Sequence, residues 1–175
     1  DDRVKAQATA DLLQFLRDSE VLRDEEARAV VPDCATVSEG IYRRNCIRAR
    51  NGWTGDLVAL ARALRVGAGP QRDDAAIARL LELAAARGNS HAQWELSLML
   101  RQGVGATQDH SRALGLARAA AEAGDAAGLN VYGVMIRDGI GRASDDTEAA
   151  IWFQRAADLR NSYGMTNLAR FMWEG

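Results

Sequence analysis

Two histidines are the side chains in this sequence best suited to acid–base chemistry. Catalysis requires a nucleophile, a base within reach and a group that stabilises developing charge. His91 and His110 each stand alone, no serine follows a nucleophile-elbow pattern, and the acidic residues are scattered along the chain. An isolated histidine in such a setting is most often solvated. We therefore predict that the protein is not an enzyme, with no catalytic residues and no cofactor.

The two cysteines, Cys34 and Cys46, are the other reactive pair. A structural metal site needs four ligands at suitable spacing, and no histidine lies near them, so we expect no metal site. They are either two buried thiols or one disulfide. A disulfide would imply an oxidising compartment such as the periplasm, and free thiols would favour the cytoplasm.

Glycine triplets of the form Gly-x-Gly recur at a fixed interval of 36 residues. They do not form a phosphate-binding loop, because no strand is expected before them and no Lys-Ser/Thr pair follows them. Such a period indicates a repeat architecture. The glycines in phase are Gly67 and Gly69, Gly103 and Gly105, Gly139 and Gly141, and finally Gly175.

Other positions repeat with the same 36-residue period, and each position keeps its type of side chain. There is a large apolar position, a small position directly after it, a second large apolar position, an arginine, an aspartate and an alanine doublet. In order, these are Leu60, Leu96, Tyr132 and Leu168; Ala61, Ser97, Gly133 and Ala169; Leu64, Leu100, Ile136 and Met172; Arg65, Arg101 and Arg137; Asp73, Asp109 and Asp145; Ala84, Ala120 and Ala156, each followed by another alanine.

Each unit therefore reads as two helices. In the first, large apolar residues four positions apart form a stripe, and the small residue allows the neighbouring helix to approach closely. The triplet ends this helix, because glycine adopts the left-handed C-cap conformation without a side-chain penalty. The aspartate precedes the second helix as an N-cap. We expect second helices at about residues 74–86 and from residues 111 and 146, and stability from the stacking of units.

The third unit resembles the Sel-one-like repeat (SLR) family of tetratricopeptide-like helical repeats. The resemblance covers residues 52–175 and implies a right-handed α-solenoid of antiparallel helix pairs, whose first helices line a concave binding face. Asp56 departs from the family pattern, which usually has Ala or Gly there. The matching residues are Gly128, Tyr132, Gly133, residues 138–141, Asp145, residues 149–153, Ala156 and Ala157.

The two ends of the chain differ from the repeats. We predict that residues 1–51 form a divergent helical N-terminal cap, with helices at about 4–17, 24–30 and 38–50. Residues 52–175 then hold three full units and the first helix of a fourth. Because Gly175 falls on the glycine column that follows a first helix, we expect the array to continue beyond it.

The expected binding surface consists of first-helix positions that are not used for packing. Large or hydrogen-bonding side chains there suit the capture of an extended peptide. Trp94 either binds a partner or packs against the neighbouring helix, whereas Trp152 lies on a packing column. The candidates are Arg62, His91, Trp94, Glu95, Leu98, Asn130, Val134, Tyr163, Thr166, Asn167 and Arg170, with Val58 and Val131 beside them.

We therefore expect a protein–protein interaction scaffold or adaptor that binds a protein or peptide, in bacterial envelope signalling or assembly as the resemblance implies. A net charge of -2 argues against nucleic acid, and no apolar run approaches the ~20 residues that a membrane span needs. One alternative is a regulatory or self-associating domain of a larger membrane-linked protein. A lactam-binding or lactam-hydrolysing enzyme, attributed to some relatives, is a weaker one, because no lactam nucleophile motif is present.

Overall fold

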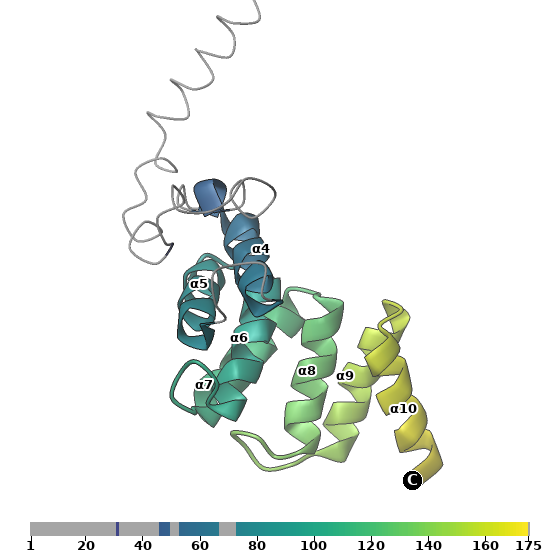
Figure 1. Ribbon diagram of the computed structural model, residues 1–175. Helices are drawn as coiled ribbons and strands as arrows, with labels where there is room; N and C mark the ends of the chain where they lie inside the picture. Colours follow the sequence, from purple (N-terminus) through teal and green to yellow (C-terminus); the bar gives the residue numbers. More distant parts are fainter. Residues whose placement is uncertain (1–30, 32–45, 50–52, 67–72, 175) are drawn as a thin grey trace, which may run out of the picture. The chain divides into compact units, whose positions relative to one another are not determined.

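The computed structural model describes residues 31, 46–49, 53–66 and 73–174, and every regular element within these residues is helical. The cap helices predicted at 4–17 and 24–30 lie outside them, as do Cys34 and the first glycine triplet; residues 46–49 are helical, within the helix expected at 38–50. Figure 1 shows the helices. They are α4 (Thr54–Arg65), α5 (Asp74–Ala86), α6 (Ser90–Gln102), α7 (His110–Glu122), α8 (Ala126–Arg137), α9 (Asp146–Asp158) and α10 (Ser162–Glu174).

The chain divides into two compact units, residues 1–72 and 73–175. In the first, α4 buries an apolar stripe that includes Leu57, Leu60 and Leu64. The Arg48 guanidinium lies 2.9 Å from the Asp56 carboxylate and 5.1 Å from the centre of the Trp53 ring. The aspartate that departs from the repeat pattern therefore has a local ionic partner.

In the second unit, each helix packs against the next one along the chain, from α5 through to α10. The first helices of successive pairs also lie side by side, α6 against α8 and α8 against α10 (Figure 1). This recurring pattern of contacts confirms the all-α solenoid with a 36-residue period. No described helix has the length and apolar character needed to cross a membrane.

The aspartate column begins the second helices, as predicted. Asp73, Asp109 and Asp145 each precede their helix with an extended backbone. Their carboxylates accept hydrogen bonds from the backbone N–H groups of Ala76, Arg112 and Glu148, at 3.0, 2.9 and 2.9 Å. These bonds satisfy N–H groups that have no partner inside the helix.

A second set of capping residues, which was not predicted, begins the first helices. Asn89, Asp125 and Asn161 accept hydrogen bonds from backbone N–H groups of α6, α8 and α10 at 2.9–3.0 Å. The residue before each cap has positive φ: 78° at Gly88 and Gly124, and 58° at Arg160. The signal available in the sequence was a glycine followed by Asn or Asp, at Gly88 and Gly124.

In the two triplets that the structure describes, the first and second glycines have different roles. Gly103 ends α6 in the left-handed conformation, with φ 70°. Gly105 also has positive φ, but a Cβ there would overlap the carbonyl oxygen of Asp74 in the first turn of α5. The same contact recurs one repeat later, where a Cβ on Gly141 would lie 2.6 Å from the carbonyl oxygen of His110 in the first turn of α7. The second glycine thus lets a loop pack directly on the preceding second helix.

The small column permits close helix packing, as predicted. A Cβ on Gly133 of α8 would lie 2.8 Å from Cε1 of Phe153 in α9, a ring that is fully buried. Ala84, Ala120 and Ala156, the first members of the alanine doublets, are also fully buried. Trp152 packs edge-to-face on Tyr132, with ring centres 5.0 Å apart, which agrees with its predicted structural role.

Candidate functional site

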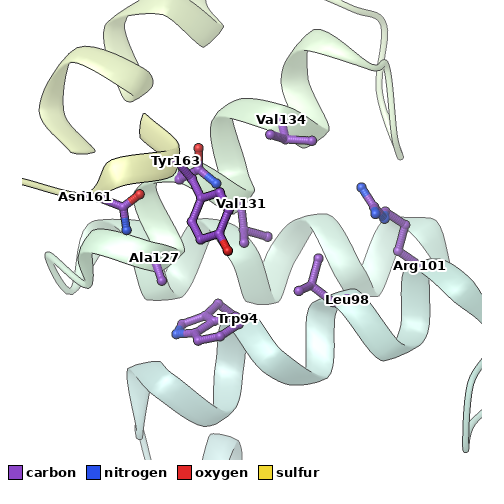
Figure 2. Close-up of a pocket in the computed structure, with 9 residues that line it drawn as sticks. Trp94, Leu98, Arg101, Ala127, Val131, Val134, Asn161 and Tyr163 are labelled. Atoms are coloured by element: carbon purple, nitrogen blue, oxygen red, sulfur yellow. The ribbon is translucent and has the colours of Figure 1, made fainter. Parts of the chain in front are cut away.

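A groove lies between α6, α8 and the start of α10 in the second unit. It contains a cavity of about 380 Å³, at the small end of the range for ligand pockets. Side chains from neighbouring repeats meet there, mainly apolar ones (Figure 2). The lining residues are Trp94, Leu98, Arg101, Ala127, Asn130, Val131, Val134, Asn161 and Tyr163.

Helical periodicity explains why these residues share one surface. Trp94, Leu98 and Arg101 are spaced at i, i+4 and i+7 on α6, which places them on one face. Asn130 and Val134 occupy the corresponding positions of α8, 36 residues later. Stacking two repeats therefore turns one stripe of side chains into the two walls of a groove.

Trp94 is held in place by its neighbours on α6. The His91 ring packs edge-to-face on Trp94, with ring centres 4.6 Å apart. Nε2 of His91 lies 3.0 Å from the carboxylate of Glu95, which is only 3% exposed. Glu95 therefore does not offer a free surface carboxylate in the groove; together with His91 it positions the tryptophan.

The indole N–H of Trp94 is buried and has no hydrogen-bond partner among the described residues. An unsatisfied buried donor costs about 1–3 kcal/mol. The position of Trp94 therefore leaves its own polar group unsatisfied in the described residues. Its ring forms a wall of the cavity.

Tyr163 lies across the cavity from Trp94. Figure 2 shows its ring above the indole, with the hydroxyl directed toward α6. The side chain is 72% exposed, although it lies at the edge of an apolar surface. Exposed tyrosine and half-buried tryptophan are the residue types most enriched where proteins bind partners.

An amide network supports the wall formed by α8. Nδ2 of Asn167 donates to Oδ1 of Asn130 at 2.8 Å, and the Arg137 guanidinium donates to Oδ1 of Asn167 at 3.5 Å. Arg137 also pairs with the carboxylate of Asp138 at 2.7 Å. Asn167 does not line the cavity; it orients Asn130, which does.

Arg101 differs from Arg137, its counterpart one repeat later. Its half-buried side chain lines the cavity, and its guanidinium has no ion pair or hydrogen bond within the described part of the chain. Its backbone carbonyl accepts a hydrogen bond from Nε2 of Gln108 at 2.8 Å. Among the described residues, the groove thus carries a cationic group without a neutralising carboxylate.

The remaining predicted residues lie elsewhere. The Thr166 hydroxyl donates to the carbonyl of Ser162 at 2.9 Å, and both Thr166 and Arg170 are exposed on α10. Arg62 is exposed on α4, in the first unit, and is not among the residues that line the cavity.

Three of the lining residues were not predicted from the sequence: Arg101, Ala127 and Asn161. Each occupies a position that the 36-residue period could have indicated. Arg101 belongs to the arginine column, Ala127 lies 36 residues after His91, and Asn161 is 36 residues after Asp125. Arg101 was assigned only to the end of a first helix, and Ala127 and Asn161 were not considered, although all three line the cavity.

The described residues offer little for catalysis. The His91–Glu95 pair could orient a base, but the nearby hydroxyls of Ser90 and Ser97 donate to the Asp125 carboxylate and the Trp94 carbonyl. Within the described residues, no three His, Cys, Asp or Glu side chains are grouped as metal ligands. On the exposed side of α7, a hydrogen bond to Glu122 raises the pKa of Arg118 above its usual value.

The Sel1 repeat matches this chain three times, at residues 57–89, 90–125 and 126–161. The chain belongs to the Sel1 repeat family. The matched segments run through the helix pairs from α4 to α9, and α10 follows them as the first helix of a further pair. Sel1 repeats mediate protein interactions, and the family is typically non-catalytic. The search of curated proteins found no match to this sequence.

Two solved structures of this family resemble the chain. One is a protective antigen from uropathogenic Escherichia coli that displays an SLR fold, with 26% identity and a TM-score of 0.68. The match covers 74% of this chain and 28% of the antigen, so this chain corresponds to a small part of that protein. The other is a Sel1 repeat protein from Oxalobacter formigenes, with 28% identity, a TM-score of 0.63 and coverage of 73% of this chain and 96% of that one.

Proposed function

We propose that the chain is a non-catalytic adaptor that binds a segment of a partner protein in the groove between α6, α8 and α10. The observation that carries this proposal is the 380 Å³ cavity, whose walls come from matching positions of successive repeats. Its apolar surface would otherwise be exposed to water at a cost of roughly 25 cal/mol for each Å². A partner side chain inserted between Trp94 and Tyr163 would cover that surface.

Replacing Trp94 with alanine tests this proposal. The probe is a set of peptides selected from a random displayed library against the whole chain, then synthesised and labelled. We expect Trp94→Ala to weaken their binding at least about 30-fold, because a central aromatic anchor contributes about 2 kcal/mol or more. Fluorescence anisotropy gives the affinities, and circular dichroism checks that the helices are retained.

Trp94→Phe is the matched control. It keeps an aromatic ring in the wall, but it removes the indole N–H, which has no partner in the described residues, together with the five-membered ring that carries it. Binding within about threefold of wild type is expected, with thermal stability close to that of wild type. If the selected peptides bind Trp94→Ala as tightly as wild type, the groove is not the binding surface. If no peptide binds and light scattering shows a dimer, the alternative of a self-associating domain is favoured.

A role in the bacterial envelope is part of the proposal. The similar antigen from uropathogenic E. coli supports it, because a protective antigen fits an exported member of the family. The buried position of Cys46 is compatible with the disulfide to Cys34, which stays a prediction. Intact mass after alkylation, with and without reductant, tests it. We expect both thiols to resist alkylation until reduced, and free alkylation of both would favour a cytoplasmic adaptor instead.

A further inference from the structure

We propose that the partner segment is acidic, with a large apolar side chain between Trp94 and Tyr163 and a carboxylate on Arg101. This inference rests on the proposed function and specifies the chemistry of the partner. It follows from three features of the groove: a cation without an ionic partner in the described residues, the distance between this cation and Trp94, and an amide donor on the opposite wall.

The first feature is the charge. Arg101 lines the cavity without an ionic partner in the described residues, whereas its equivalent Arg137 pairs with Asp138. The neighbouring carboxylates of this groove are already engaged. Glu95 bonds to His91, and Asp125 caps α8 and accepts from Ser90. A half-buried guanidinium is best satisfied by a carboxylate, whose two oxygens match its planar donors.

The second feature is the distance along α6. Trp94 and Arg101 are seven residues apart on this helix, which corresponds to about 10 Å at a rise of 1.5 Å per residue. An extended peptide advances about 3.3 Å per residue. An extended partner that lies along α6 would therefore carry its carboxylate about three positions from its apolar anchor.

The third feature is Asn130, which lies on the opposite wall. Its Oδ1 accepts a hydrogen bond from Asn167, and this fixes the orientation of the amide. Its Nδ2 group makes no hydrogen bond within the described residues and belongs to a side chain that lines the cavity. It can donate to a backbone carbonyl of an extended peptide that lies in the groove.

The test uses octapeptides with acetylated and amidated ends, so that only side chains carry charge. Trp or Leu is fixed at position 3, and Asp, Glu, Asn, Gln or Lys is placed at position 5, 6 or 7. For wild type we expect Asp or Glu at position 6 to bind about tenfold or more tightly than Asn or Gln, as befits a charge-assisted hydrogen bond. Raising the salt concentration should reduce this preference.

The decisive variants are Arg101→Glu and Arg101→Gln. Arg101→Glu should invert the preference toward Lys, and Arg101→Gln should abolish the preference for an acid. Arg118→Glu is the control charge reversal, because Arg118 lies on α7 and pairs with Glu122 outside the cavity. Unchanged circular dichroism shows that each variant is folded.

Two results would overturn the inference. If wild type binds the peptides through Trp94 without preferring an acid, the inference of an acidic partner is wrong. The proposed binding groove would be unaffected. An acidic preference that Arg101→Glu does not change would place the carboxylate elsewhere, with the same consequence. If wild type binds none of the peptides in either experiment, the proposed function itself fails.

Discussion

Replacement of Gly105 with alanine is expected to destabilise the second unit by about 3–5 kcal/mol, because two separate costs add. The residue has φ 72°, a conformation that costs an L-residue about 1–2 kcal/mol. In addition, the new Cβ would overlap the carbonyl oxygen of Asp74 in the backbone of α5. A backbone group cannot rotate away as a side chain can, so the first turn of α5 or the loop after α6 has to move. Urea unfolding followed by circular dichroism measures the loss.

Gly88→Ala provides the matched control. Gly88 has φ 78°, and a Cβ there would meet nothing within 4 Å. It therefore carries only the conformational cost, about 1–2 kcal/mol. If the two variants lose the same stability, the contact with α5 has no energetic weight. Amide hydrogen exchange locates the effect: Gly105→Ala should reduce the protection of amides at the start of α5 and leave those of α9 protected.

The fold could be predicted from the sequence because its determinants are local and repeated. An aspartate before a helix caps it in any context, and a 36-residue period fixes which positions share a face. The second helix α5 spans residues 74–86 as predicted, and Asp73, Asp109 and Asp145 all cap. The contact of Gly105 with Asp74 could not be predicted, because the two residues belong to different repeats and meet only after stacking.

The sequence positions that form the groove were predictable, but the burial and hydrogen bonding of their side chains were not. The pattern placed Trp94, Leu98, Asn130, Val134 and Tyr163 on one surface, and all five line the cavity. It did not show that Glu95 is buried against His91 or that Asn167 bonds to Asn130. These states depend on which polar groups find partners across repeats, and residue type alone does not determine that.

The largest effect in the core is expected at Phe153. This ring is fully buried in α9, against Gly133 of α8 and 5.9 Å from the centre of the Phe171 ring in α10. Phe153→Ala should lower the free energy of unfolding by about 3–5 kcal/mol, since it leaves a cavity between three helices. Chemical denaturation measures the loss.

Gly133→Ala probes the same contact from the other side. Whether it lowers or raises the free energy of unfolding should depend on the residue at 153. In the native background the added methyl would lie 2.8 Å from Cε1 of the ring, and such overpacking costs about 1–3 kcal/mol. In the Phe153→Ala background the methyl enters the vacated space, and replacing a helical glycine gains up to about 1 kcal/mol. A double-mutant cycle should therefore show strong coupling between the two positions. Additive effects would mean that residues 133 and 153 have no interaction energy.

This contact also links the core to the groove. Gly133 precedes Val134 on α8, so a methyl that pushes α8 away from α9 displaces the wall that carries Asn130 and Val131. Gly133→Ala should accordingly weaken peptide binding, and Phe153→Leu should partly restore it in the double variant. Because neither substitution touches the cavity itself, such rescue would show that the close packing of α8 on α9 sets the width of the groove.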